Sequence, residues 1–337
     1  MKRIVAIVAL ALFFFILISP LSGQLKALGA ILVLFSAGMA LTYLGMEGSY
    51  GFVLLKSDVH KHIRISHAYK ELAEDLVRAT LILSFGVFYI LAFLKHPRKL
   101  RILAFYLFMA IGIGVLTFSA LSQFLGGSPN FLAIGVLTVL GHGTVTLISL
   151  IANSALIIYT LISGGSPDPG ATLLLPGINL PLVEGILAVI ILAVFHELGH
   201  AALSLFKNIK MHSAGALLFG VIPIGAFVEP DEEAMKKLSK EDHADILAAG
   251  SGSNYLLSIF FAGLFFAYSY VGVQFQPIST FLFYSLFLNY IIATVNCLPI
   301  FITDGARLFA LYVPSLERSL NLTTVIALAI NFLPNFL

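Results

Sequence analysis

Two histidines and a glutamate lie in the middle of the apolar stretch VIILAVFHELGHAAL, residues 189–203. The letters HELGH place His196 and His200 four residues apart, so on a helix both imidazoles project from one face. Two such rings can bind one metal ion at about 2.1 Å. Glu197 follows the first histidine, where it can serve as general base to a metal-activated water. The pattern favours metal chemistry over two hydrogen-bonded core histidines, because unpaired ionisable groups are costly in lipid.

A catalytic zinc takes three protein ligands, so the two histidines leave one position to fill. Three other ionisable residues stand in apolar surroundings: Glu184, His142 and Asp304. Glu184 is about three helical turns from His196 on the same helix, which is too far. His142 lies between two glycines, a setting typical of a helix break or of close helix packing. Asp304 stands in NCLPIFITDGARL, residues 296–308, where it is either a ligand or part of an interfacial Asp-Gly turn.

Asn254 ends the run AGSGSN, residues 249–254, near the start of another apolar stretch. The small residues before it permit two helices to approach closely. Its amide could donate to a substrate carbonyl or to a developing oxyanion. A hydrogen bond that only joins two helices accounts for it equally well.

The composition is that of an integral membrane protein. Of 337 residues, 59% are hydrophobic and 11% are charged, whereas soluble domains carry about 25% charged residues. The net charge of +2 is too small to indicate a nucleic-acid partner. The single cysteine, Cys297, excludes an intrachain disulfide and a cysteine-based metal cluster. We therefore predict an all-α polytopic membrane protein, a multi-helix transmembrane bundle in a lipid bilayer.

Nine stretches approach the roughly 20 apolar residues that cross a bilayer. The first follows a basic start and resembles a signal sequence, but SPLSGQ is a poor cleavage site, so we expect an uncleaved helix. Residues 131–162 contain the letters GHG, which would kink or divide a helix, and 278–313 are interrupted by Pro299 and the letters DG. The candidate spans are 4–21, 27–44, 76–94, 102–125, 131–162, 182–206, 246–271, 278–313 and 323–336.

Three connections between the spans are informative. Residues 47–75 mix basic and acidic side chains and are typical of an interfacial or soluble segment. Residues 164–181 form a Gly/Pro loop without a basic residue. Residues 211–229 are rich in glycine and β-branched residues, which predicts a small strand-containing segment that dips into the membrane against protein.

The distribution of basic residues orients the second half of the chain. By the positive-inside rule, the HELGH helix runs from outside to the cytoplasm. Residues 95–101, KHPRKLR, conflict with this orientation, because the span count places them outside. The conflict indicates that the number of predicted membrane crossings before residue 162 is wrong by one. The residues that share the predicted cytoplasmic side are Lys207, Lys210, Lys236, Lys237, Lys240, Arg307 and Arg318.

Four motifs in this order, HELGH, GAFVEPDEE, AGSGSN and NCLPIFITDG, resemble the site-2 protease family of intramembrane zinc metalloproteases. That family pairs H-E-x-x-H with N-x-x-P-x-x-x-x-D-G, which Asn296, Pro299, Asp304 and Gly305 satisfy here. The spacing is most similar to the branch of the membrane-bound transcription factor site-2 protease. The resemblance covers about residues 182–313.

The resemblance implies a complete metal site. Asp304 would be the third ligand of one Zn²⁺ per chain, beside His196 and His200. Glu197 would be the catalytic general base and acid.

Two further residues match family positions that hold substrate or the site in place, Asn254 and Asn296. Ser251 departs from the family, since many members carry proline there. The interval 206–246 is too short for an inserted PDZ domain, so we expect none.

These observations divide the chain into four parts. The N-terminal helices lie outside the family core and include the interfacial segment 47–75. The expected parts are 1–165 for the N-terminal transmembrane helices, 166–181 for the Gly/Pro loop, 182–313 for the catalytic core and 314–337 for a C-terminal transmembrane helix.

The resemblance implies a multi-pass metalloendopeptidase of a cell membrane that cleaves transmembrane substrates in regulated intramembrane proteolysis. A membrane zinc transporter is one alternative, but it would need further metal sites along a path. A non-catalytic protein that binds membrane clients is another, although its H-E-x-x-H motif would be expected to be broken.

Overall fold

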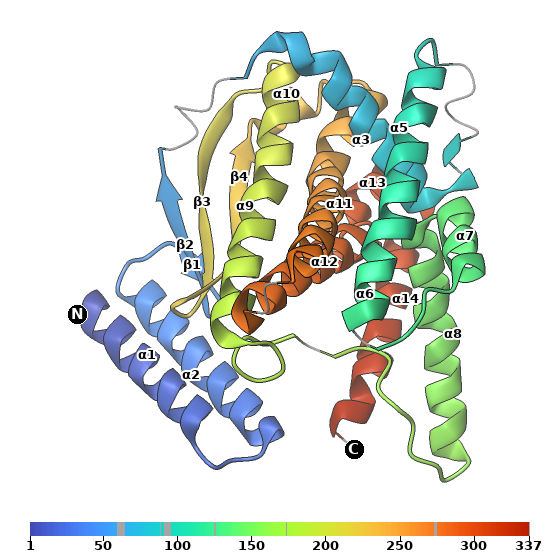
Figure 1. Cartoon of the computed structure of the whole chain (residues 1–337). Helices are drawn as coiled ribbons and strands as arrows, with labels where there is room; N and C mark the ends of the chain where they lie inside the picture. Colours follow the sequence, from blue (N-terminus) through green and yellow to red (C-terminus); the bar gives the residue numbers. More distant parts are fainter. Residues whose placement is uncertain are drawn as a thin grey trace.

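The computed structural model is a helical bundle with a small sheet along one side (Figure 1). It describes residues 1–58, 65–87, 89–90, 96–124, 126–172, 174–272 and 275–336. The predicted class, a polytopic helical bundle with a strand-containing segment, is confirmed. The helices are α1 (Lys2–Ile18), α2 (Gly23–Tyr43), α3 (Lys70–Phe85), α5 (Lys99–Ile111), α6 (Phe118–Phe124), α7 (Phe131–Leu140), α8 (His142–Ile162), α9 (Leu182–Phe206), α10 (Glu232–Met235), α11 (Lys240–Val271), α12 (Gln276–Val295), α13 (Asp304–Tyr312) and α14 (Pro314–Phe332).

Among the described residues, 7 helices are long and apolar enough to cross a membrane. They are α2, α8, α9, α11, α12, the continuous helix α5–α6, and α14 with the turn that follows it. A π-helical turn, η3 (Gly112–Thr117), joins α5 to α6. The chain is therefore organised as a multi-pass membrane protein.

The predicted crossing by residues 76–94 is wrong, although residues 88 and 91–95 lie outside the described part of the chain. α3 ends before Gly86, which has φ 62°. Arg98 then makes ion pairs to Glu74 at 2.7 Å and to Asp75 at 3.1 Å, near the start of α3. The chain therefore returns to the end of the bundle from which α3 began.

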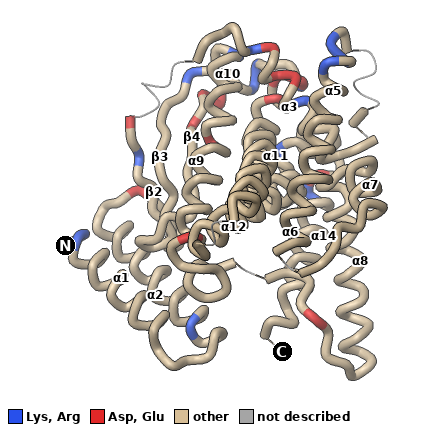
Figure 2. The backbone as a smooth tube through the Cα atoms, viewed as in Figure 1, with Lys and Arg blue, Asp and Glu red and all other residues tan. Residues whose placement is uncertain are grey.

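This return removes the conflict in the predicted orientation. Lys207, which follows α9, also binds Glu74, with 2.7 Å between Nζ and Oε1. The basic residues at the start of α5 therefore share one end of the bundle with the end of α9. Figure 2 shows basic and acidic residues side by side at this end, around α3, α5 and α10.

Two helix breaks meet inside the bundle. The long stretch 131–162 is divided at Gly141, as its GHG letters predicted, into α7 and α8. Gly141 has φ 90°, and a Cβ there would lie 2.4 Å from the backbone nitrogen of Gly86. Both positions need glycine, because each combines a positive φ with close backbone contact.

The sheet is antiparallel, in the order β1 (Gly48–Ser49), β2 (Phe52–Ser57), β3 (Met211–Phe219) and β4 (Ile222–Pro230). Strands were predicted within residues 211–229, where β3 and β4 lie, whereas β1 and β2 come from the segment expected to be interfacial or soluble. The hairpin turns at Gly220, which has φ 62° and whose Cβ would lie 2.4 Å from the carbonyl oxygen of Leu34 in α2. The tip of the hairpin therefore rests on α2, while its long strands run beside α9 (Figure 1).

Candidate metal centre

Three side chains of types that can bind a metal ion converge between α9 and α13. The Nε2 atoms of His196 and His200 are 3.2 Å apart. Oδ2 of Asp304 lies 3.5 Å from the first and 3.0 Å from the second. The side chains of His196, His200 and Asp304 are only 13%, 12% and 16% exposed, so the donors face one another in a shielded space.

His200 has a fixed orientation. Its Nδ1 lies 2.8 Å from the carbonyl oxygen of Ile246 in α11, which can only accept a hydrogen bond. A proton is therefore on Nδ1, and this bond directs Nε2 towards Asp304. Nδ1 of His196 is buried and has no hydrogen-bond partner among the described residues.

Asn296 holds the aspartate in place. Its Nδ2 donates to Oδ2 of Asp304 at 2.6 Å, and its Oδ1 accepts from the backbone nitrogen of Asp304 at 3.3 Å. Thr303 caps α13 by accepting from the nitrogen of Ala306 at 3.3 Å, which places the aspartate in the first turn of that helix. The amide predicted to bind substrate thus contacts a donor of the metal centre.

Two glycines allow α9 and α11 to approach at this point. A Cβ on Gly250 would lie 2.4 Å from Nε2 of His196 and 2.5 Å from Nε2 of His200. A Cβ on Gly199 would lie 2.5 Å from the carbonyl oxygen of Ala249. Sequence reasoning did not assign a role to Gly250; the run of small residues AGSGSN was the available signal.

Glu197 faces the sheet. Its Oε2 accepts a hydrogen bond of 2.9 Å from the backbone nitrogen of Val228 in β4. A groove of about 620 Å³ lies between this part of α9 and the sheet. Its lining is almost wholly apolar and includes Ala193 and Val194 of α9 and Ala226 of β4. The candidate base therefore lies where the groove meets the metal donors.

Asn254 and His142 lie away from the three donors. Asn254 is fully buried one turn beyond Gly250, and neither atom of its amide has a partner among the described residues. His142 is also buried, with its Nδ1 2.9 Å from the hydroxyl of Tyr290. It belongs to an aromatic cluster, as expected of a histidine at a helix break.

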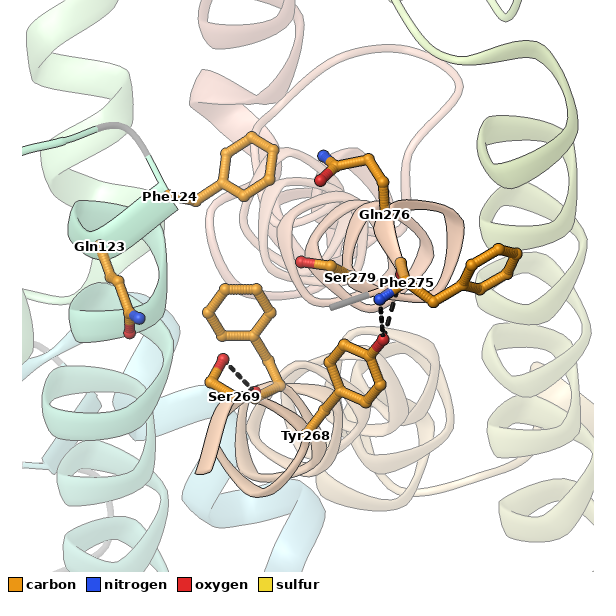
Figure 3. A pocket seen from close by; sticks show the side chains of 8 residues that line it. Gln123, Phe124, Tyr268, Ser269, Phe275, Gln276 and Ser279 are labelled. Atoms are coloured by element: carbon orange, nitrogen blue, oxygen red, sulfur yellow. Dashed lines mark hydrogen bonds between the residues drawn. The ribbon is translucent and has the colours of Figure 1, made fainter. Parts of the chain in front are cut away.

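A second cavity, of about 410 Å³, lies between α6, α11 and α12 (Figure 3). The hydroxyl of Tyr268 accepts from the nitrogen of Phe275 at 2.7 Å and donates to its carbonyl oxygen at 3.1 Å. Tyr268 is about 27 Å along α11 from Gly250. The lining carries amides, hydroxyls and aromatic rings, and among the described lining residues none is a histidine or a carboxylate.

The two histidines of an H-E-x-x-H helix and an aspartate from a second helix form a donor set that suits a catalytic metal ion. Residues 184–275 match the model of peptidase family M50, the family of the site-2 proteases, which confirms the predicted resemblance over that part of the chain. The match over this segment supports a metallopeptidase. The matched segment includes His196, Glu197 and His200 and ends before Asp304.

One relative is the uncharacterized protein MJ0971 of Methanocaldococcus jannaschii, which is 35% identical over 99 residues. This similarity covers 29% of the present chain and 27% of the relative, so the chain matches about a quarter of that protein's length. No solved structure matches the chain.

Proposed function

We propose that the chain is an intramembrane zinc metalloprotease of the site-2 type. It would hydrolyse peptide bonds within or near transmembrane helices of membrane-protein substrates, as a step of regulated intramembrane proteolysis in a cell membrane. The observation that carries this proposal is the convergence of His196, His200 and Asp304, with donor atoms within 4.8 Å of one another, beside Glu197.

The donor set fits one Zn²⁺. Two imidazoles and one carboxylate are a usual ligand set for a catalytic zinc, which leaves a position for water or substrate. The bond from Nδ1 of His200 to Ile246 directs its Nε2 towards the other two donors, and Gly250 leaves clear the space that a side chain would fill. When bound, zinc would polarise the substrate carbonyl and lower the pKa of a water molecule.

Glu197 is the proposed general base and acid. It takes a proton from the attacking water and returns it to the leaving amine. Asn254, one turn beyond Gly250 in α11, has an amide without a partner among the described residues, which can donate to a substrate carbonyl or an oxyanion. Asn296 orients Asp304 through the hydrogen bond at 2.6 Å.

The groove beside β4 is the proposed place of the substrate. An amide within a helix is shielded by its own hydrogen bonds, so the substrate must unwind before hydrolysis. Among the described residues β4 is the end strand of the sheet, and Val228 donates to Glu197 and so directs its N–H away from β3. An extended substrate segment can pair along this edge and fill the groove with apolar side chains.

The test compares the wild type with Glu197→Gln and Asp304→Asn, purified in detergent. We expect about one zinc per wild-type chain and cleavage of a model transmembrane substrate. Glu197→Gln should retain zinc and lose roughly 10²–10⁴-fold in rate, because only proton transfer is removed. Asp304→Asn should lose zinc, whereas Glu184→Gln, in the first turn of α9, should change neither property.

One result would refute the hydrolytic proposal: zinc bound by the wild type, with cleavage unchanged in Glu197→Gln. Zinc flux into proteoliposomes would then test the transport alternative. Binding of a membrane client without cleavage would favour the non-catalytic alternative.

A further inference from the structure

A buried ion pair joins α3 to α11 near the charged end of the bundle. Arg78 in α3 donates to Asp245 in α11 through two parallel bonds, Nε to Oδ1 at 3.0 Å and Nη2 to Oδ2 at 2.8 Å. The two side chains are 7% and 2% exposed. A bidentate pair of this kind fixes geometry as well as charge.

The neighbouring carboxylates already have a cation among them. Nζ of Lys207 lies 2.7 Å from Glu74 and 3.2 Å from Asp245, and it also binds Asp242. Burial opposes the charge of Glu74, yet hydrogen bonds from Arg98 and Lys207 hold its pKa below the ordinary value. This cluster is therefore a set of ion pairs between α3, α5, α9 and α11, with an ammonium group where a metal ion would otherwise fit.

The ion pair lies next to the hydrogen bond that orients a metal ligand. Asp245 directly precedes Ile246, whose carbonyl oxygen accepts from Nδ1 of His200 at 2.8 Å. Gly250, which leaves room for both imidazoles, follows one turn later. Arg78 thus anchors the part of α11 on which the ring of His200 depends.

α3 also contacts the loop that carries the aspartate. Sγ of Cys297 donates to the hydroxyl of Ser84 in α3 at 3.2 Å, and Cys297 directly follows Asn296. One turn earlier in α3, Thr80 packs on Gly252 of α11. A Cβ on Gly252 would lie 2.9 Å from Oγ1 of Thr80. α3 therefore touches both α11 and the loop before Asp304, although it precedes the segment that matches the peptidase family.

We infer that α3 supports the metal centre from outside the segment that matches the peptidase family, and that Arg78 is a positioning residue for His200. Through Asp245, Arg78 fixes the carbonyl of Ile246 and thereby the direction of Nε2. The inference rests on the proposed function only in taking His196, His200 and Asp304 as a metal site. Loss of an outer contact to a metal ligand commonly weakens metal affinity by about 10–100-fold.

The experiment measures zinc affinity by chelator competition and the visible spectrum of the Co²⁺-loaded protein. Arg78→Lys retains the charge but loses the two parallel bonds. We expect zinc affinity to fall about 10–100-fold and the Co²⁺ bands to shift, with elution volume and the melting of the metal-free protein close to wild type. The control is Arg101→Lys at the same charged end, since Arg101 pairs with Glu71 at 3.0 Å and with Asp75, both in α3.

A second variant guards against a loss of folding. Arg78→Leu/Asp245→Leu removes both buried charges together, which preserves stability better than removing one. It should also bind zinc more weakly than wild type. Wild-type affinity and an unchanged Co²⁺ spectrum in both variants would overturn the inference. These readouts do not depend on peptide hydrolysis, which Glu197→Gln tests separately.

Discussion

Helix α9 meets α11 on one face and the four-stranded sheet on the other, and the two contacts differ in kind. Against α11, glycines at 199 and 250 bring the helices so close that a methyl group would overlap neighbouring atoms. Against the sheet, α9 and the strands line a groove of about 620 Å³. The two proposed tasks of α9, metal binding and substrate binding, thus fall on faces with different packing.

The difference follows from what each face must do. A metal site needs donors held within a few tenths of an ångström, which close packing and the bond from His200 to Ile246 provide. A substrate channel needs space and a surface that accepts many apolar side chains. Glu197 directly follows His196 in the chain. Its side chain points to the sheet face of α9, yet it remains next to the histidines on the α11 face. Substitutions on the α11 face should therefore affect the metal, and substitutions on the sheet face should affect the substrate.

The largest effect is expected from Gly250→Ala. The added methyl group would lie about 2.5 Å from both imidazole Nε2 atoms, well inside van der Waals contact. We expect zinc affinity and cleavage to fall at least about 100-fold, as measured by zinc content and substrate turnover. Gly263→Ala in the same helix is the matched control, because nothing lies within 4 Å of its Cβ position. Full zinc content in Gly250→Ala would show that the α11 face is less rigid than its packing indicates.

A smaller effect is expected on the sheet face from Ala226→Phe. Ala226 lines the groove, so a phenyl ring would take space that a substrate side chain needs. We expect kcat/KM for a transmembrane substrate to fall about tenfold, with unchanged zinc affinity. The comparison between the two faces would fail if this variant lost zinc, or if it cleaved the substrate at the wild-type rate.

Much of the site was predictable because it depends on local patterns. The bounds of α9 agree with the predicted span 182–206, and the letters HELGH alone place two imidazoles on one face. Pro299 and Gly305 correctly predicted that residues 278–313 would be interrupted, and α12 ends at Val295. Apolar length, helix spacing and helix-breaking residues all act within a few turns of the chain.

The rest depends on contacts between distant segments. The return of the chain after α3 depends on ion pairs from Arg98 to Glu74 and Asp75. These residues lie 24 and 23 positions earlier in the chain, so a hydropathy window cannot detect the pairs. Strand β2 pairs with β3, and Leu55 lies opposite Ala216. Because this partner is far away in the chain, the sequence of β2 alone does not specify the sheet. The role of Gly250 likewise appears only when α9 and α11 are placed together.

The smallest expected effect concerns the end of the sheet beyond the groove. Ser213 donates a hydrogen bond to Glu229 across β3 and β4, and Lys56 of β2 lies 3.3 Å from the same carboxylate. These two contacts hold the pKa of Glu229 below its ordinary value of 4.5, and the hydrogen bond from Ser213 has the larger effect. A carboxyl group with a lowered folded pKa stabilises the fold above its unfolded pKa, and this stabilisation disappears as pH falls through the folded pKa.

Ser213→Ala should therefore lower the melting temperature slightly at neutral pH, and the difference from wild type should close in acid, below the ordinary pKa of Glu229 near 4.5. Thermal unfolding in detergent, followed from neutral pH to about pH 3, measures this difference. In a Glu229→Gln background the effect of Ser213→Ala should not vary with pH, because the residue no longer ionises. A gap that persists in acid would assign the contribution of Ser213 to packing. Zinc affinity should be unchanged throughout, since this end of the sheet contacts none of the three donors in the described part of the chain.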